Sequence, residues 1–139
     1  EAADAASASR ELGALVEQAL RTNRTQRLPE LVERGLAADV AFFKDYPDST
    51  VSLAKRLAAA ERHDLALRLL QQFIKDDRAH RQHLTGALLA ANLLARDPKR
   101  LTAAARFLDQ LKAVYPNEPM VDQLIKSTHK ALAAAGGAV

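Results

Sequence analysis

The chain has 139 residues, of which 48% are hydrophobic, 4% aromatic and 27% charged, and its formal net charge is +3. This length suffices for one domain with a hydrophobic core. The dominance of Ala and Leu favours helices over strands, because unbranched side chains lose little rotamer freedom in a helix. The chain has no cysteine, which excludes disulfides, thiolate nucleophiles and Cys-ligated zinc sites.

Apolar residues recur at helical spacing in seven segments, which predicts an all-α protein. Pro29 suits the first turn of the second helix. Gly35 could bend or break that helix, which we expect to end at Tyr46–Pro47. The expected helices cover about residues 3–22, 29–46, 49–60, 65–76, 81–96, 98–115 and 117–135. Their apolar stripes are expected to include Leu15 in the first helix, Val40 in the second, Leu53, Ala54, Leu57 and Ala58 in the third, and Leu65, Ala66, Leu69, Leu70, Phe73 and Ile74 in the fourth.

Residues that favour the N-cap position precede four of these helices. A short polar side chain there can accept a hydrogen bond from a free N–H of the first turn. These residues are Asp48 or Ser49, Asp64, Asp97 and Asn117. The last helix is expected to end at Gly136–Gly137, since glycine tolerates the left-handed conformation that follows many helices.

The expected helix over residues 81–96 is apolar on every side of its helical wheel. Such a helix favours burial on all sides, so we expect it at the centre of the module; an exposed apolar groove or a dimer surface is the alternative. Asn92 is its central polar group, bonded to a neighbouring helix or directed at a partner. The apolar stretch Leu84–Ala95 has 12 residues, whereas a membrane span needs roughly 20, so no membrane insertion by this segment is expected.

A pair of short Ala/Leu-rich helices occurs twice. Leu53–Ala59 matches Leu89–Ala95, and Ala66–Phe73 matches Ala104–Leu111, at a spacing of 36 to 38 residues. Self-similarity at such a spacing is typical of a stacked helical repeat, and such repeats usually form binding surfaces.

These helix pairs resemble tetratricopeptide repeats, which alternate large and small residues at fixed positions in two helices and close with a proline. The matching positions are Leu53, Ala54, Leu57, Ala66 and Leu70 in one copy, and Leu89, Ala90, Leu93, Ala104, Leu108 and Pro116 in the next. The Tyr-Pro ends and the stretch Leu65–Leu70 are also similar to helical-repeat tails of some bacterial membrane proteins, which implies a tail domain of a larger bacterial protein.

The resemblance implies a right-handed stack of antiparallel helix pairs in a single domain over residues 1–139. Residues 1–47 would form divergent N-terminal helices, 49–116 the two repeats and 117–135 a capping helix. The first helices of the pairs would line a concave groove that binds a peptide or a partner helix. The residues that the resemblance places there are Asp48, Val51, Lys55, Ala91 and Asn92.

No catalytic, cofactor-binding or metal-binding residues are assigned. The five glycines form no phosphate-binding loop, and no strand–turn–helix elbow is predicted that would present a serine nucleophile. His80 and His83 are three residues apart and could share one face of a helix, but no third ligand is suggested nearby, which favours a pair of surface histidines. We therefore expect a non-catalytic protein without a cofactor.

The charge is unevenly distributed, with −3 over residues 1–50 and +6 over residues 51–139. The excess of basic residues is typical of an ordinary solvated surface, and a protein or peptide partner of acidic character is the alternative. A basic-faced nucleic-acid-binding domain and a structural oligomerisation domain, such as a homodimer, stay open as alternatives. A chain that begins with Glu1 is typical of a fragment or a processed product. A cytoplasmic location is favoured, with tethering to a membrane through a region outside this chain as the alternative.

Overall fold

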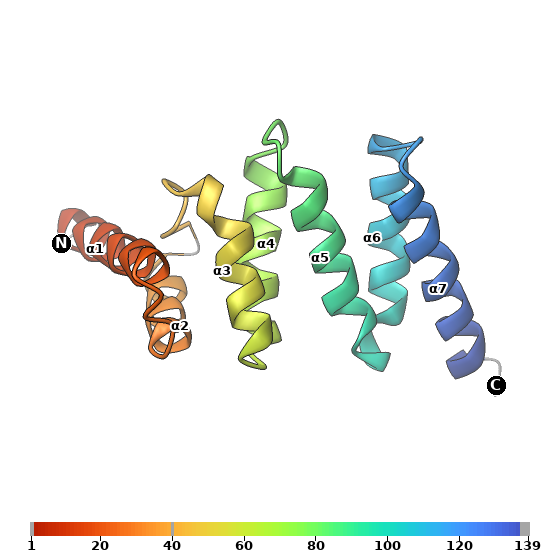
Figure 1. Cartoon of the computed structure of the whole chain (residues 1–139), viewed down its shortest axis with the longest axis horizontal. Helices are drawn as coiled ribbons and strands as arrows, with labels where there is room; N and C mark the ends of the chain where they lie inside the picture. Colours follow the sequence, from red (N-terminus) through yellow and green to blue (C-terminus); the bar gives the residue numbers. More distant parts are fainter. Residues whose placement is uncertain (1, 40, 137–139) are drawn as a thin grey trace. The chain divides into compact units, whose positions relative to one another are not determined.

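The computed structural model describes residues 2–39 and 41–136, and within these ranges the protein consists of helices without strands. The all-α fold class predicted from the sequence is therefore confirmed. The helices shown in Figure 1 are α1 Ala2–Arg21, α2 Leu28–Ala38, α3 Pro47–Ala59, α4 His63–Asp76, α5 His83–Ala95, a 3-10 turn η1 Pro98–Arg100, α6 Leu101–Val114 and α7 Pro119–Gly136.

The chain divides into two compact units, and the division lies inside α5, between Gly86 and Ala87. The first unit contains α1 to α4 and the first turn of α5, and the second contains the rest of α5 with η1, α6 and α7. The single domain expected over residues 1–139 stays a prediction.

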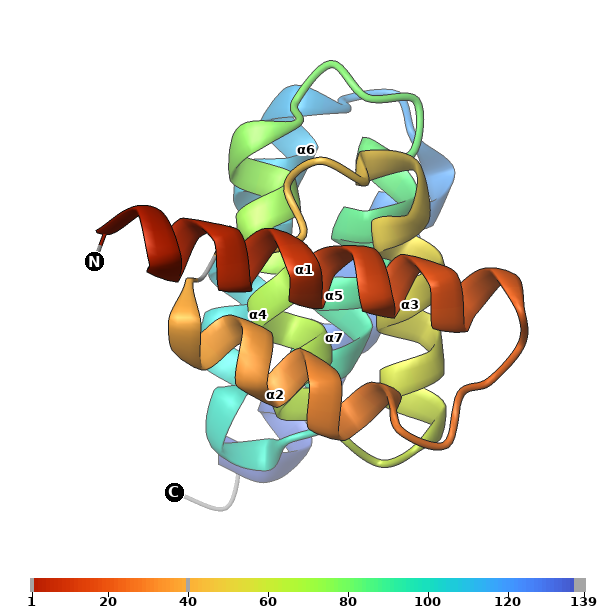
Figure 2. The same cartoon turned by 90° about the vertical axis from the view of Figure 1, so that its left-hand side faces the viewer.

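The first unit is built from two helix pairs. α1 packs against α2, α3 packs against α4, and α2 also touches α4; Figures 1 and 2 show the partners of each pair side by side. Most of the apolar stripe predicted for the pair α3 and α4 is buried, while Ala58 and Ile74 are half-buried. Its members Leu53, Ala54, Leu57, Ala66 and Leu70 all have 0% of their surface exposed.

The predicted end of the second helix is wrong, because α2 ends at Ala38 and the following segment turns. Asp39 Oδ1 accepts a hydrogen bond from the backbone N–H of Ala41 at 2.9 Å, a local bond that competes with helix continuation. Gly35 neither ends nor interrupts the helix, but its missing side chain admits the ring of Phe42. A Cβ at Gly35 would lie 2.5 Å from that ring. The predicted stripe residue Val40 lies outside the described residues.

Only one of the four predicted N-caps is confirmed. Asp97 Oδ1 accepts from the backbone N–H of Lys99 at 3.0 Å and opens the 3-10 turn that leads into α6. α3 instead begins at Pro47, so Asp48 and Ser49 lie in its first turn, where Pro at the first position suits the local geometry.

The other two caps are displaced by one or two residues. Arg62 precedes α4, which places Asp64 inside its first turn, and α7 begins at Pro119, after the expected cap Asn117. The structure follows α7 to Gly136, while Gly137 lies outside the described residues.

In the second unit α6 packs most extensively against α7. Their buried residues are Leu101, Ala104, Ala105, Leu108, Leu111, Val121 and Thr128. The repeat interpretation pairs the sixth helix with the fifth, so the stacked repeat stays a prediction. α5 is not buried on all sides as expected, because Ala90 and Leu93 are buried, Leu88 and Leu94 are half-buried and Asn92 is exposed.

Candidate functional site

The five residues predicted to bind a partner differ in exposure. Asp48 and Lys55 are exposed on α3, whereas Val51 on the same helix is buried, with 2% of its surface exposed. On α5, Ala91 is buried, with 1% exposed, and Asn92 is exposed. Because the first three belong to the first unit and the last two to the second, the groove that would join them stays a prediction.

Asp48 belongs to a polar cluster with the loop that precedes α5. Its Oδ1 lies 2.7 Å from Nε2 of His80, whose Nδ1 accepts the backbone N–H of Gln82 at 3.0 Å. An imidazole that accepts at Nδ1 carries its proton at Nε2, so Nε2–H donates to Asp48. The His80 ring also packs edge-on against Phe73, with 5.3 Å between centroids. Both ring nitrogens are thus engaged, and His80 fixes the loop to α3.

His83 is a buried residue, not the surface histidine expected from the sequence, and has 5% of its surface exposed. Its Nε2 lies 3.1 Å from the carbonyl oxygen of Ile74. A carbonyl only accepts, so Nε2 donates and ties the start of α5 to α4. Throughout the described part of the chain no group of three or more His, Asp or Glu side chains could hold a metal ion.

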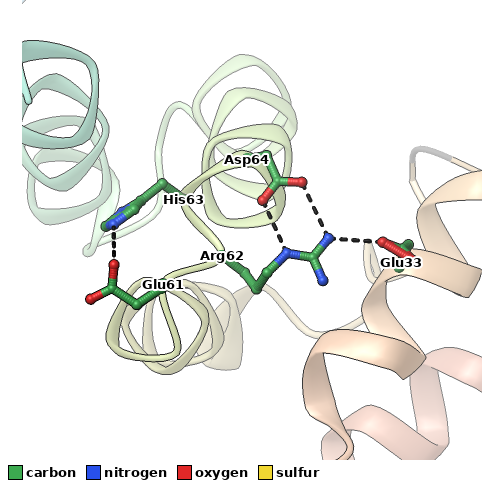
Figure 3. A network of polar contacts seen from close by, with 5 residues as sticks. All are labelled: Glu33, Glu61, Arg62, His63 and Asp64. Atoms are coloured by element: carbon green, nitrogen blue, oxygen red, sulfur yellow. Dashed lines mark hydrogen bonds and ion pairs between the residues drawn. The ribbon is translucent and has the colours of Figure 1, made fainter. Parts of the chain in front are cut away.

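The turn between α3 and α4 carries an ion-pair network, drawn in Figure 3. Arg62 Nη2 donates to Glu33 Oε2 of α2 at 2.8 Å. Its Nε and Nη2 each lie 3.3 Å from an oxygen of Asp64. Arg62 therefore connects α2 with the first turn of α4.

The same contacts shift two pKa values. The hydrogen bond from Arg62 lowers the pKa of the Asp64 carboxyl group below its ordinary range, because it stabilises the charged form. The hydrogen bonds to Asp64 and then Glu33 raise the pKa of Arg62. Both side chains therefore carry their charges at neutral pH.

A shallow depression lies beside this network, where α2 meets the outer side of α4. It is lined by Leu36, Arg68, Gln71, Gln72 and Lys75 and holds about 210 Å³. We call these five residues the α2–α4 depression. Arg68 and Lys75 are exposed, and neither forms an ion pair or a side-chain hydrogen bond within residues 2–39 and 41–136.

The position of the depression follows from the helix geometry. Leu36 is about one turn beyond Glu33 on α2, and Arg68 is about one turn beyond Asp64 on α4. The Arg62 network thus lies about one turn before the depression on both helices. Gln72 donates to Asp76 farther along α4.

The depression was not predicted from the sequence. Arg68 and Lys75, seven residues apart, lie on one face of a helix, but such a pair is also typical of a solvated face. Only the structure shows that nearby carboxylates are already bound by Arg62 and Gln72.

A second recess in the first unit is too small for a ligand. It holds about 20 Å³, room for about one water molecule. The residues that line it are Ala41, Phe43, Lys44, Thr50, Leu69, Gln72, Phe73, Asp76 and Asp77. Small-molecule sites usually enclose roughly 300–1,000 Å³, so neither hollow has the dimensions of an enclosed substrate pocket.

No helix in residues 2–39 and 41–136 combines the length and the apolar character needed to cross a bilayer. No protein-family model, curated protein or solved structure matches this chain.

Proposed function

We propose that this protein is a non-catalytic docking module that binds a partner protein or peptide on the outer side of its helices. The observation that carries the proposal is the α2–α4 depression, which presents two exposed cations, Arg68 and Lys75, with no carboxylate partner among the described residues. Exposed charges without intramolecular partners are available for intermolecular contacts, where complementary charge speeds association and selects partners.

The chemistry of the polar clusters supports binding more than catalysis. A general base needs a nitrogen or oxygen within reach of a substrate proton. In the first unit His80 uses both ring nitrogens in contacts with Asp48 and Gln82, and His83 donates to Ile74. The shallow depression likewise suits a side chain of a larger partner.

The groove expected from the tetratricopeptide resemblance is part of the same proposal, as a second surface. Its exposed members in the first unit are Asp48 and Lys55 on α3. The depression is preferred because its lining residues lie together in one unit.

Selection of binding peptides from a random display library tests the proposal. Selected peptides should bind the wild-type protein and lose affinity for the double variant Arg68→Ala, Lys75→Ala. The variant Lys55→Ala, Arg56→Ala removes the same charge from α3 and tests the predicted groove. Lys126→Ala, Lys130→Ala on α7 is the matched control for charge alone.

Peptides whose affinity depends only on Lys55 and Arg56 would move the docking surface to α3. A library that yields no specific binder, together with turnover in an enzymatic screen, would overturn the proposed function.

A further inference from the structure

We propose that the α2–α4 depression receives a helix that carries two carboxylates seven residues apart, which approach Arg68 and Lys75. This inference rests on the proposed docking function and adds the chemistry and the spacing of the partner.

The spacing follows from α4 itself. Arg68 and Lys75 are seven residues apart on one helix, which is about two turns and roughly 10.5 Å along the axis. A partner helix laid along α4 repeats at the same interval, so acidic residues at positions i and i+7 face both cations at once. Carboxylates at i and i+5 point about 140° apart around the helix, and only one of them reaches a cation.

Carboxylates near both ends of the depression limit how much negative charge a partner can bring. At one end Glu33 and Asp64 surround Arg62, and at the other Asp76 follows Lys75 and accepts a hydrogen bond from Gln72. A third acidic residue beyond either cation would approach these groups and be repelled. The depression therefore presents two cationic positions for the carboxylates of a partner.

The same arrangement disfavours a nucleic acid. Single-stranded nucleic acids are held by continuous basic grooves and by aromatic side chains on which bases stack. The lining of the depression has no aromatic residue, and only two of its five side chains are cationic. An evenly charged phosphate backbone would meet the flanking carboxylates.

The floor of the depression determines which side chain of the partner helix fits between the partner's two carboxylates. Leu36 has 3% of its surface exposed, so it offers a shallow apolar floor and little area to bury. A small side chain such as alanine at the middle of the partner helix allows close approach. The exposed Gln71 lies beside it and can bond a polar neighbour.

The test uses two synthetic Ala/Gln-rich helical peptides of equal composition and a fluorescent label. One has glutamates at positions i and i+7 and the other at i and i+5. Fluorescence anisotropy with the full chain should show about tenfold tighter binding of the i, i+7 peptide, which is about 1.4 kcal/mol. The difference should disappear in Arg68→Ala, Lys75→Ala and persist in Lys126→Ala, Lys130→Ala.

A charge swap gives a second, independent readout. The variant Arg68→Glu, Lys75→Glu should prefer a peptide with lysines at i and i+7 to its i, i+5 isomer, once circular dichroism shows an unchanged helix content. If every folded variant binds the i, i+7 and i, i+5 peptides equally well, the proposed spacing of seven residues between the partner's carboxylates is wrong. The docking function would still stand if library-selected peptides required Arg68 and Lys75. Tighter binding of a single-stranded oligonucleotide that displaces the peptide would replace the partner class with nucleic acid and overturn both proposals.

Discussion

Two polar regions of the first unit lie about one helical turn apart on α4 and use their charges differently. In the Arg62 network a guanidinium group contacts the carboxylates of Glu33 and Asp64. In the α2–α4 depression the side chains of Arg68 and Lys75 have no such contact among the described residues. Paired charges connect α2 with the turn before α4, whereas the unpaired charges of the depression are the ones that we propose for contact with a partner. Ion pairing together with the neighbouring hollow, rather than the number of basic residues, distinguishes the two regions.

The largest effect should come from removing the packing that holds α2 in place. Phe42 has 3% of its surface exposed, and its ring fills the space beside Gly35. Phe42→Ala should lower the free energy of unfolding by about 3–5 kcal/mol, as buried aromatic truncations do, and should also abolish peptide binding. Urea denaturation followed by circular dichroism measures the change. Phe42→Leu is the control and should cost less; an unchanged midpoint in Phe42→Ala would contradict the packing described here.

A smaller loss of stability is expected from replacing His83, whose ring donates a hydrogen bond at the start of α5. His83→Phe keeps a ring in the buried position but removes the donor to the carbonyl of Ile74. A buried group that loses its partner costs about 1–3 kcal/mol, so the midpoint of thermal unfolding should fall. His83→Gln retains an N–H donor and should recover part of the loss. If the phenylalanine variant is as stable as the wild type, the hydrogen bond does not contribute to the fold.

The variant Arg68→Ala, Lys75→Ala should separate binding from stability. Exposed substitutions away from special features change stability by about 0.5 kcal/mol or less each, so its unfolding curve should nearly overlay that of the wild type. Its affinity for acidic peptides should nevertheless fall. A marked loss of stability would show that the two cations have a structural role. The depression would then resemble the Arg62 network in what its charges do.

The smallest expected effect is a change in how the free energy of unfolding depends on pH. Because the hydrogen bond from Arg62 lowers the pKa of Asp64 below its ordinary value of 3.8, the stabilisation is fully present above that value. It is lost as the pH falls through the lowered pKa of the folded state. Denaturation at pH 7 and near pH 3 should therefore show a slightly weaker acid destabilisation in Asp64→Asn than in the wild type. An identical pH dependence of the two proteins would show that the ionised Asp64 side chain does not stabilise the fold through the Arg62 network.

Much of the helical fold was predictable because helix periodicity is a local signal. Leu53, Leu57 and Leu70 were expected on a buried stripe and are fully buried. Asp97 was expected to cap a helix and does so. The end of α2 was missed because an apolar segment after Asp39 continues the helical pattern, and only the structure reveals how Phe42 packs on Gly35. Leu15, expected on the buried stripe of α1, is 49% exposed.

The candidate site was less predictable because ion pairing depends on distant parts of the chain. Arg62 and Lys75 each have an acidic residue two positions later, but only Arg62 is paired with it in the structure. The second contact of Arg62 is with Glu33, 29 residues away, and it depends on how α2 packs beside α4. The predicted docking residues on α3 and α5 came from a resemblance in pattern, which does not report whether a side chain such as Val51 is buried.

The exposed position of Gln71 at the depression has a practical consequence. Since the chain lacks cysteine, the single substitution Gln71→Cys would create a unique thiol for an environment-sensitive dye. Such a dye would report when the depression is occupied, at partner concentrations far below those needed for calorimetry, and would leave the buried face of α4 untouched.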